Sequence, residues 1–400
     1  MRRMLDKLLV LDITNNIAGP CCAAMLADHG AEVIHVEKPV WGDDSRHFYP
    51  PIGGMSGTFF YANRNKKSLV IDLKDPQGAE IIRNIAASAD VLIESNRPGV
   101  MKRLGLDYES IRQLNPSLIY CSISAFGQKG PLSSRAGYDI IAQAYSGMMY
   151  YTGESGSGPV KNYFSIGDFV TSYNAYGNIM TALYYRAKTG VGQHIDMALA
   201  RGLLAMNMCI SDNITGIPRR KTGNHDMHLC PYGIFNGPRG ESLVIAAINV
   251  ALWDKLCAAM ERPELAHDPR YITNDARCDN MDDVIDMIER WLNTFDSVDA
   301  AAKRLTEYGV PNIKPYTVTD ILNDRHAHEL GWIRELPLPD SVEVAKTCPA
   351  AYGYADFSET DTNMAPAPKL GEHNIELLTR FGMSVEEAEK LTSIWMCGAK

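Results

Sequence analysis

Short apolar runs alternate with helical patterns along the first third of the chain. Strands are predicted where runs rich in Leu and β-branched residues end at polar or glycine positions, at 8–13, 31–37, 68–73, 90–95 and 117–124. Helices are predicted between them, at 21–29 and 76–89. Because strands separated by single helices favour parallel pairing with both faces covered, the pattern predicts an α/β domain around a parallel sheet.

The pattern changes in the second half of the chain. A long helix is predicted at 170–188 and a further strand at 193–199. The segment 218–242 then places three prolines among polar and glycine residues, which is typical of a domain boundary. We therefore expect a large domain over 1–222, a smaller α+β domain over 223–325, and a linker with a C-terminal return to the large domain over 326–400.

Composition narrows the choice of partners. The chain has 39 Lys and Arg against 48 Asp and Glu, which gives a net charge of −9. This charge disfavours the binding of nucleic acid, and any anionic ligand needs a local cluster of basic residues. Nine cysteines without a C-x-x-C pair suit a reducing compartment, and we expect a cytoplasmic protein. No apolar run approaches the ~18–20 residues of a membrane helix, so no membrane partner is expected.

Several motifs of common enzyme classes are missing from the sequence. The first loop, 14–20, lacks G-x-G-x-x-G, which disfavours nicotinamide and flavin cofactors. Neither a P-loop nor a G-x-S-x-G nucleophile motif occurs. His225, His228 and Cys230 lie close together but lack the second ligand pair of a Cys–His site, so no metal is expected.

Basic residues follow the predicted strands of this acidic chain. Lys38, Lys74, Arg97 and Arg103 come after strands whose carboxyl ends meet at one edge of a parallel sheet. They could face a polyphosphate there. The alternative is a solvated charged surface, which is the commoner place for Lys and Arg, and the residues alone favour neither reading.

One carboxylate has an unusual setting. Asp168 lies in YFSIGDFVTSYNAYG among small and apolar residues, directly before the predicted long helix. It could cap that helix, because an aspartate there accepts a backbone N–H and complements the helix dipole. It could also be a nucleophile. Both roles stay open at this point.

Ordered motifs along nearly the whole chain resemble those of the class III CoA-transferase family, of the formyl-CoA and carnitine type. They are IAGP (17–20), MLADHGAEVIHVEKP (25–39), NRNKKSLVIDLK (63–74), RPGVMKRLGLDYESI (97–111), NPSLIYCSISAFGQKGP (115–131), RAGYDIIAQAYSG (135–147), the Asp168 segment, KTGVGQHIDMAL (188–199), LCPYGIF (229–235), YGVPNIKPYTVTDILND (308–324) and KLGEHN (369–374). The resemblance implies a Rossmann-like parallel sheet with a smaller α+β domain, in an interlocked homodimer. It also implies CoA exchange between an acyl-CoA and a free carboxylic acid, with the CoA thioester as substrate and neither a metal nor an organic cofactor.

The resemblance assigns roles to individual residues. Asp168 falls on the family's nucleophile, which forms an acyl anhydride and then an aspartyl–CoA thioester, and a helix N-terminus is expected to keep it ionised. The residues implied in binding CoA or substrate are Asn15, Asn16, Ile17 and Ala18 near the pantetheine, Lys38, Lys74 and Arg103 near the phosphates, Asn96 and Arg97 after a strand, and Tyr138 and Asp139 near the reacting centre.

The chain departs from the family pattern at two places. Ser95 and Asn96 stand where the family commonly has Asn-Phe, so an aromatic partner for adenine is missing there. The segment TGNHDMHL (222–229) replaces a run of glycines found in some members, and His225 and His228 could instead shape the acid pocket. The identity of the acid and of the acyl-CoA donor stays open.

Two other functions remain as alternatives. A racemase branch with a similar fold reads RAGHD where this chain has Tyr138, and a phenol of pKa ~10 is a poorer base at neutral pH than a histidine of pKa ~6.5. A non-catalytic acyl-CoA binding protein would not need the nucleophile at Asp168. The sequence therefore favours transfer of CoA over both.

Overall fold

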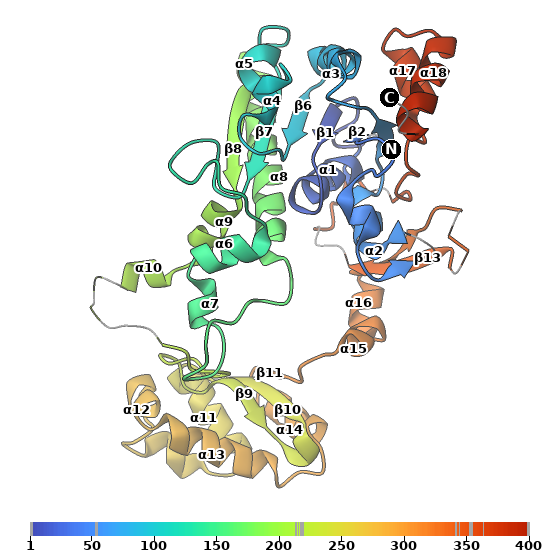
Figure 1. Ribbon diagram of the computed structural model, residues 1–400. Coiled ribbons are helices and arrows are strands. Elements are labelled where there is room, and N and C mark those ends of the chain that lie inside the picture. The colour runs from blue at the N-terminus through green and yellow to red at the C-terminus, as the bar shows by residue number, and fades with distance from the viewer. Residues whose placement is uncertain are drawn as a thin grey trace. The chain divides into compact units, whose positions relative to one another are not determined.

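The computed structural model describes residues 3–52, 55–212, 214, 216, 220–340, 342–343, 345–351, 355–362 and 364–397. The chain divides into two compact units (Figure 1). The larger unit consists of Met1–Met148, Lys161–Ile210 and Ala327–Lys400, and the smaller unit consists of Met149–Val160 and Ser211–His326.

The segment Met149–Val160 differs from the expected boundaries, which put it in the large domain. It belongs to the smaller unit, where Gly223 N donates a hydrogen bond to Gly153 O at 3.2 Å. Lys221 Nζ donates to Ser157 O at 3.3 Å in the same unit. A polar, glycine-rich loop has no hydrophobic period that would assign it to either core, so only these hydrogen bonds reveal where it packs.

A six-stranded sheet forms the centre of the larger unit, and all of its neighbouring strands are parallel. The strands are β1 (Leu9–Ile13), β2 (Glu32–Glu37), β5 (Lys67–Val70), β6 (Val91–Glu94), β7 (Ile119–Ser124) and β8 (Gln193–Ala198). Their order is β5-β2-β1-β6-β7-β8, so the strand order reverses between β1 and β6. The predicted α/β fold around a parallel sheet is confirmed.

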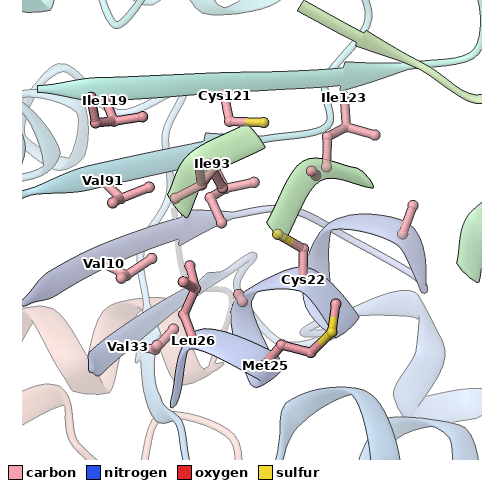
Figure 2. Close-up of a cluster of buried hydrophobic side chains, with 14 of the residues drawn as sticks. Val10, Cys22, Met25, Leu26, Val33, Val91, Ile93, Ile119, Cys121 and Ile123 are labelled. Atoms are coloured by element: carbon pink, nitrogen blue, oxygen red, sulfur yellow. The ribbon is translucent and has the colours of Figure 1, made fainter. Parts of the chain in front are cut away.

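Side chains of the central strands point alternately to two apolar cores. Val10 of β1 lies in the first core, shown in Figure 2, whereas Leu9 and Leu11 lie in the second. The helices that contribute to the first core include α1 (Ala18–Asp28), α8 (Ile166–Thr189) and α9 (Leu199–Met206). Those that contribute to the second include α3 (Pro76–Ser88), α17 (Asn374–Arg380) and α18 (Val385–Cys397). Both faces of the sheet are therefore covered (Figure 1).

The C-terminal segment returns to the edge strand of this sheet. Asn374 Oδ1 accepts a hydrogen bond from Val70 N at 2.8 Å, and His373 N donates to Ser68 O at 3.2 Å. Leu377 of α17 is buried in the second core. The last helices thus hold β5 in place, and the residues that follow β5 line a cleft described below.

Shorter elements complete the larger unit and its borders. They are η1 (Asp44–His47), β3 (Pro51–Ile52), β4 (Met55–Ser56), α2 (Gly57–Asn63), α4 (Val100–Arg103), α5 (Tyr108–Ile111), α6 (Asp139–Tyr145), α7 (Met148–Tyr151), α10 (Cys209–Asp212), α16 (Arg325–Glu329), β12 (Ile333–Pro337) and β13 (Thr347–Ala351). None of the described helices is both long enough and apolar enough to span a bilayer.

The smaller unit is an α+β structure with its own core. Its antiparallel sheet has the order β11-β10-β9, with β9 (Tyr232–Asn236), β10 (Ser242–Ala246) and β11 (Asn312–Ile313). Its helices are η3 (Pro238–Gly240), α11 (Val250–Ala259), η4 (Pro263–His267), α12 (Asn274–Asp279), α13 (Met281–Leu292), α14 (Val298–Glu307) and α15 (Val318–Leu322). Trp253 is fully buried in this core.

Three charged side chains, Asp12, His35 and Lys66, form a buried charge cluster below the carboxyl end of β1. Asp12 Oδ2 accepts from Lys66 Nζ at 2.8 Å and lies 2.9 Å from His35 Nδ1, and all three side chains are 0% exposed. Burial lowers the pKa of His35, but the charge of Asp12 and its hydrogen bond outweigh burial and raise that pKa to about 9. Thr14 N donates to Asp12 Oδ1 at 3.1 Å, so the cluster also holds the first residues of the loop after β1.

Removing one member of the cluster tests its contribution to stability. Lys66→Met should lower the free energy of unfolding by about 3–5 kcal/mol, because it leaves the buried Asp12 carboxylate with one cation fewer. Lys67→Met is the matched control, since Lys67 pairs with Glu32 and Glu376 at the surface and its loss should amount to about 0–1 kcal/mol. Urea denaturation measures both variants, and equal losses would contradict the prediction.

Candidate active site

Two neighbouring clefts lie at the carboxyl ends of the parallel strands, where doubly wound sheets bind ligands. The first, the basic cleft, has a volume of about 430 Å³. It is lined by Ile13, Thr14, Asn15, Val36, Glu37, Lys38, Pro39, Gly42, Asp43, Ile71, Asp72, Leu73, Lys74, Asn96, Val100, Arg103 and Leu104. It therefore gathers the residues that follow β1, β2, β5 and β6.

The second cleft, the Asp168 cleft, has a volume of about 310 Å³. It is lined by Ile13, Asn15, Asn16, Ile17, Ala18, Asp44, Ser95, Asn96, Arg97, Pro98, Ile123, Ser124, Ala125, Ser133, Arg135, Ala136, Gly137, Tyr138, Asp168 and Leu199. Ile13, Asn15 and Asn96 line both clefts, so the two are adjacent at the point where the strand order reverses.

The structure brings together nearly all of the residues that the sequence singled out. Those that line the basic cleft are Asn15, Lys38, Lys74, Asn96 and Arg103. Those that line the Asp168 cleft are Asn15, Asn16, Ile17, Ala18, Asn96, Arg97, Tyr138 and Asp168. Asp139 is absent from both linings and contacts the backbone before Asp168 instead.

Hydrogen bonds from neighbouring loops fix the loop after β1. Asn15 N donates to Ser95 Oγ at 3.0 Å, and Asn15 Oδ1 accepts from Asp44 N at 2.8 Å. Asn16 N donates to Asp43 Oδ1 at 3.2 Å, and Asn16 has a φ of 74°, which asparagine tolerates better than most residues. The loop between the two clefts is therefore held from both sides.

The cations of the basic cleft have different partners. Lys38 Nζ donates to Asp44 Oδ1 at 2.6 Å, and Trp41 Nε1 donates to the same oxygen at 3.0 Å. Within the part of the chain that the structure describes, no carboxylate forms an ion pair with Lys74 or Arg103. These two side chains can accept an anionic ligand without first losing an internal partner.

Asp168 is the third residue of α8, and Ser165 takes the N-cap position. Of the two roles that the sequence left open, the N-cap role does not apply to Asp168, because the helix starts before it. Asp139 Oδ1 accepts the Gly167 N–H at 2.7 Å and so satisfies one of the first-turn donors, which have no partner inside a helix. The side chain of Asp168 is left to face the cleft.

Asp168 is only partly ionised at neutral pH. Burial, and then the neighbouring Asp139 carboxylate, raise its pKa to about 7. This differs from the expectation that the helix N-terminus keeps the carboxylate ionised, because burial and a like charge oppose the helix dipole here. A carboxylate of raised basicity is a better nucleophile in the fraction of molecules where it is charged.

Arg135 and Asp44 are among the lining residues that the sequence-based prediction missed. Arg135 lines the Asp168 cleft, and among the described residues no carboxylate pairs with Arg135 or with Arg97. Arg135 is the first residue of the RAGYD motif, three positions before Tyr138, so its place in this motif was a usable signal. No such signal marks Asp44, because its hydrogen bonds with Asn15 depend on the approach of a different loop.

The histidines near residue 225 belong to the smaller unit. The ring of His225 packs edge-on against Phe235 at 4.9 Å, and burial lowers its pKa. Within the described residues, no three His, Cys, Asp or Glu side chains come together in a way that could hold a metal ion. A role of His225 and His228 in the acid pocket stays a prediction.

A sequence model described as CoA-transferase family III matches residues 5–374. The chain belongs to this family. It is similar to the human succinyl-CoA:glutarate CoA-transferase, with 34% identity over 386 residues that cover 94% of this chain and 85% of that protein. It is also similar to the succinyl-CoA–D-citramalate CoA-transferase of Chloroflexus aurantiacus, with 34% identity over 388 residues that cover 94% of each chain.

Solved structures of the family agree with the fold. A CAIB/BAIF family protein from Brucella suis is similar with a TM-score of 0.83 and 34% identity, over 95% of this chain and 100% of that one. Family III membership makes the chain a CoA-transferase, with an acyl-CoA and a carboxylic acid as its substrates. Residues from several of the motifs singled out in the sequence line the two clefts described above.

The raised pKa of Asp168 predicts that this residue destabilises the fold. Its folded pKa of about 7 exceeds the ordinary value of 3.8, so the ionised carboxylate is disfavoured in the folded state and stability falls as pH rises from about 4 to 7. Asp168→Asn should therefore raise the free energy of unfolding at pH 8 by about 1–3 kcal/mol, and by less at pH 5.

Thermal and urea unfolding at the two pH values measure this effect. Asp254→Asn, at an exposed position of the smaller unit, is the control and should change stability by less than about 0.5 kcal/mol at either pH. An Asp168→Asn variant that gains no more at pH 8 than at pH 5 would be inconsistent with the raised pKa.

Proposed function

We propose that this protein transfers CoA from an acyl-CoA to a free dicarboxylic acid, with Asp168 as the nucleophile. The observation that carries the proposal is the position of Asp168 in a cleft that adjoins the basic cleft. A nucleophile next to a separate group of cations suits a substrate that has a reactive thioester at one end and phosphates at the other.

The basic cleft is the proposed site of the CoA nucleotide. Lys74 and Arg103 are available to its phosphates, and Lys38 is available once Asp44 is displaced. The apolar side chains of the same cleft, including Leu73 and Leu104, can contact the adenine in place of the aromatic residue missing at Asn96. The pantetheine would then pass Asn15 and Asn96, which line both clefts, and bring the thioester to Asp168.

The reaction we propose begins with two acyl exchanges at Asp168. A carboxylate oxygen of Asp168 attacks the thioester carbonyl, the C–S bond breaks, and CoA leaves as the thiolate, giving a mixed acyl–aspartyl anhydride. The thiolate then attacks the aspartyl carbonyl, and the donor acid leaves as its carboxylate. The product of this half-reaction is an aspartyl–CoA thioester, which conserves the energy of the original thioester.

The second half-reaction reverses these steps with the acceptor acid. The acceptor carboxylate attacks the aspartyl thioester and releases the CoA thiolate, which gives a new anhydride. The thiolate then attacks the acceptor acyl carbon, and the Asp168 carboxylate leaves. Each step exchanges one acyl bond for another without net proton transfer, so exclusion of water is the main requirement on the cleft.

Charge in the Asp168 cleft supports a dicarboxylic acid as substrate. Arg97 and Arg135 both line this cleft, and a guanidinium binds a carboxylate through two parallel hydrogen bonds. One carboxylate of a diacid reacts at Asp168, so the other needs a cation within the same cleft. The two similar transferases are named for glutarate and D-citramalate, which are dicarboxylic acids.

Trapping the intermediate tests the role of Asp168. Incubation with succinyl-CoA and hydroxylamine should convert Asp168 to its hydroxamate, which mass spectrometry of the peptide detects. Asp168→Asn should lower transferase turnover at least about 10³-fold, because no nucleophile remains. Full turnover by this variant, or a hydroxamate at another residue only, would refute the mechanism. Solvent deuterium at the α-carbon without an acceptor acid would point to epimerisation instead.

A matched pair of acceptors tests the role of Arg135. Arg135→Met should lower kcat/KM for glutarate by about 10- to 100-fold, because the distal carboxylate loses a charged hydrogen-bond donor. For pentanoate, which has the same chain length and no distal carboxylate, the change should stay within about 3-fold. Arg112→Met, at an exposed position outside both clefts, is the control. Equal losses for both acids would remove Arg135 from acid recognition.

The interlocked homodimer and the cytoplasmic location, both expected from the sequence, stay predictions.

A further inference from the structure

A partly buried hydrogen-bond network, the Asp139 network, holds the backbone next to the nucleophile. Asp139 Oδ1 accepts from Gly167 N at 2.7 Å, and Asp139 Oδ2 accepts from Gln143 Nε2 at 2.7 Å. Gln143 is 1% exposed, and its Oε1 accepts from Asn162 N at 2.9 Å. The two side chains of α6 thus hold the backbone of the segment that leads into α8 and Asp168.

The hydrogen bond between Asp139 and the Gly167 N–H depends on the glycine at position 167. A Cβ at Gly167 would lie 2.8 Å from Asp139 Oδ1 and 3.1 Å from Leu203 Cδ1. The carboxylate reaches the backbone N–H only because residue 167 has no side chain. Gly167 has no left-handed φ, so its role here is the close approach of Asp139 rather than an unusual backbone conformation.

The hydrogen bond from Gly167 N to Asp139 places the Asp139 and Asp168 carboxylates near each other, because Gly167 and Asp168 are consecutive. Other titratable or charged groups of the Asp168 cleft and of the helices around the first turn of α8 include Cys21, Cys22, Asp28, Asp44, Arg97, Arg135, Tyr138, Tyr145 and Arg201. Burial raises the pKa of the Cys21 thiol to about 12, so it stays neutral. The charge that acts on Asp168 most directly is therefore that of Asp139.

We propose that Asp139 is a positioning residue for Asp168: it fixes the first turn of α8 through Gly167 and places a like charge beside the nucleophile. This inference rests on the proposed function, because it assigns Asp139 to the reaction at Asp168. Asp139 acts through Asp168 and does not touch the substrate. Its second partner, Gln143, holds the carboxylate in the orientation that Gly167 requires.

The pH profile of kcat/KM tests the electrostatic part, because it reports the ionisation of the free enzyme. In Asp139→Asn, the acid limb should move to lower pH by about one unit, since the like charge is gone. At pH 8 and above, kcat should fall about 10-fold, because a less basic carboxylate is a weaker nucleophile. The KM for acyl-CoA should stay within about 3-fold, because the cations of the basic cleft are unchanged.

Gly167→Ala tests the positioning part and removes no charged side chain. The added methyl should displace Asp139 and lower kcat by about 10- to 100-fold through loss of alignment. Gly177→Ala is the matched control on the same helix, because a Cβ there meets no atom within 4 Å, and its kcat should stay within about 2-fold of wild type.

The outcomes separate this inference from the proposed function. A purely structural role would lower thermal stability and kcat in Asp139→Asn but leave the acid limb in place, and that result would overturn the inference. So would a Gly167→Ala variant that behaves like Gly177→Ala. If hydroxylamine fails to label Asp168 in the wild-type protein, the proposed function fails whatever these variants show.

Discussion

The buried charge cluster of Asp12, His35 and Lys66 is the interaction on which the geometry of both clefts depends. It joins the ends of β1 and β2 to the segment that enters β5, and each of its members is fully buried. His35 Nε2 also lies 3.3 Å from Asp43, whose other oxygen accepts the Asn16 N–H. Since buried charges are costly when unpaired, the loops that follow β1 and β2 can move little without breaking an ion pair.

The sequence predicted the sheet well because its signals are local. Short apolar runs ending at polar or glycine residues located the strands within a few positions, as for the run 8–13 and Leu9–Ile13. Parallel strands then have a fixed consequence, because their carboxyl ends lie at one edge. Asn15, Lys38 and Asn96, which are far apart in sequence, could therefore be expected at one site.

Features that depend on contacts between distant residues could not be predicted. Asp139 and Gly167 are 28 positions apart, and nothing in either segment indicates that a side chain of α6 caps the start of α8. The start of α8 was for this reason placed too late, so an N-cap role for Asp168 stayed open beside that of a nucleophile. Its raised pKa has the same origin, because burial and the position of Asp139 are properties of the folded chain.

Asp44 provides Lys38 with an internal counter-ion. A phosphate that binds Lys38 replaces the Asp44 carboxylate, which already pairs with it. The net gain in binding free energy is therefore the difference between the two ion pairs and not the full energy of the new one. When a CoA ester leaves, Asp44 can return to Lys38, so Lys38 regains a counter-ion. An enzyme that must release one CoA ester and accept another in every cycle benefits from such exchange, because tight binding of the ground state does not speed turnover.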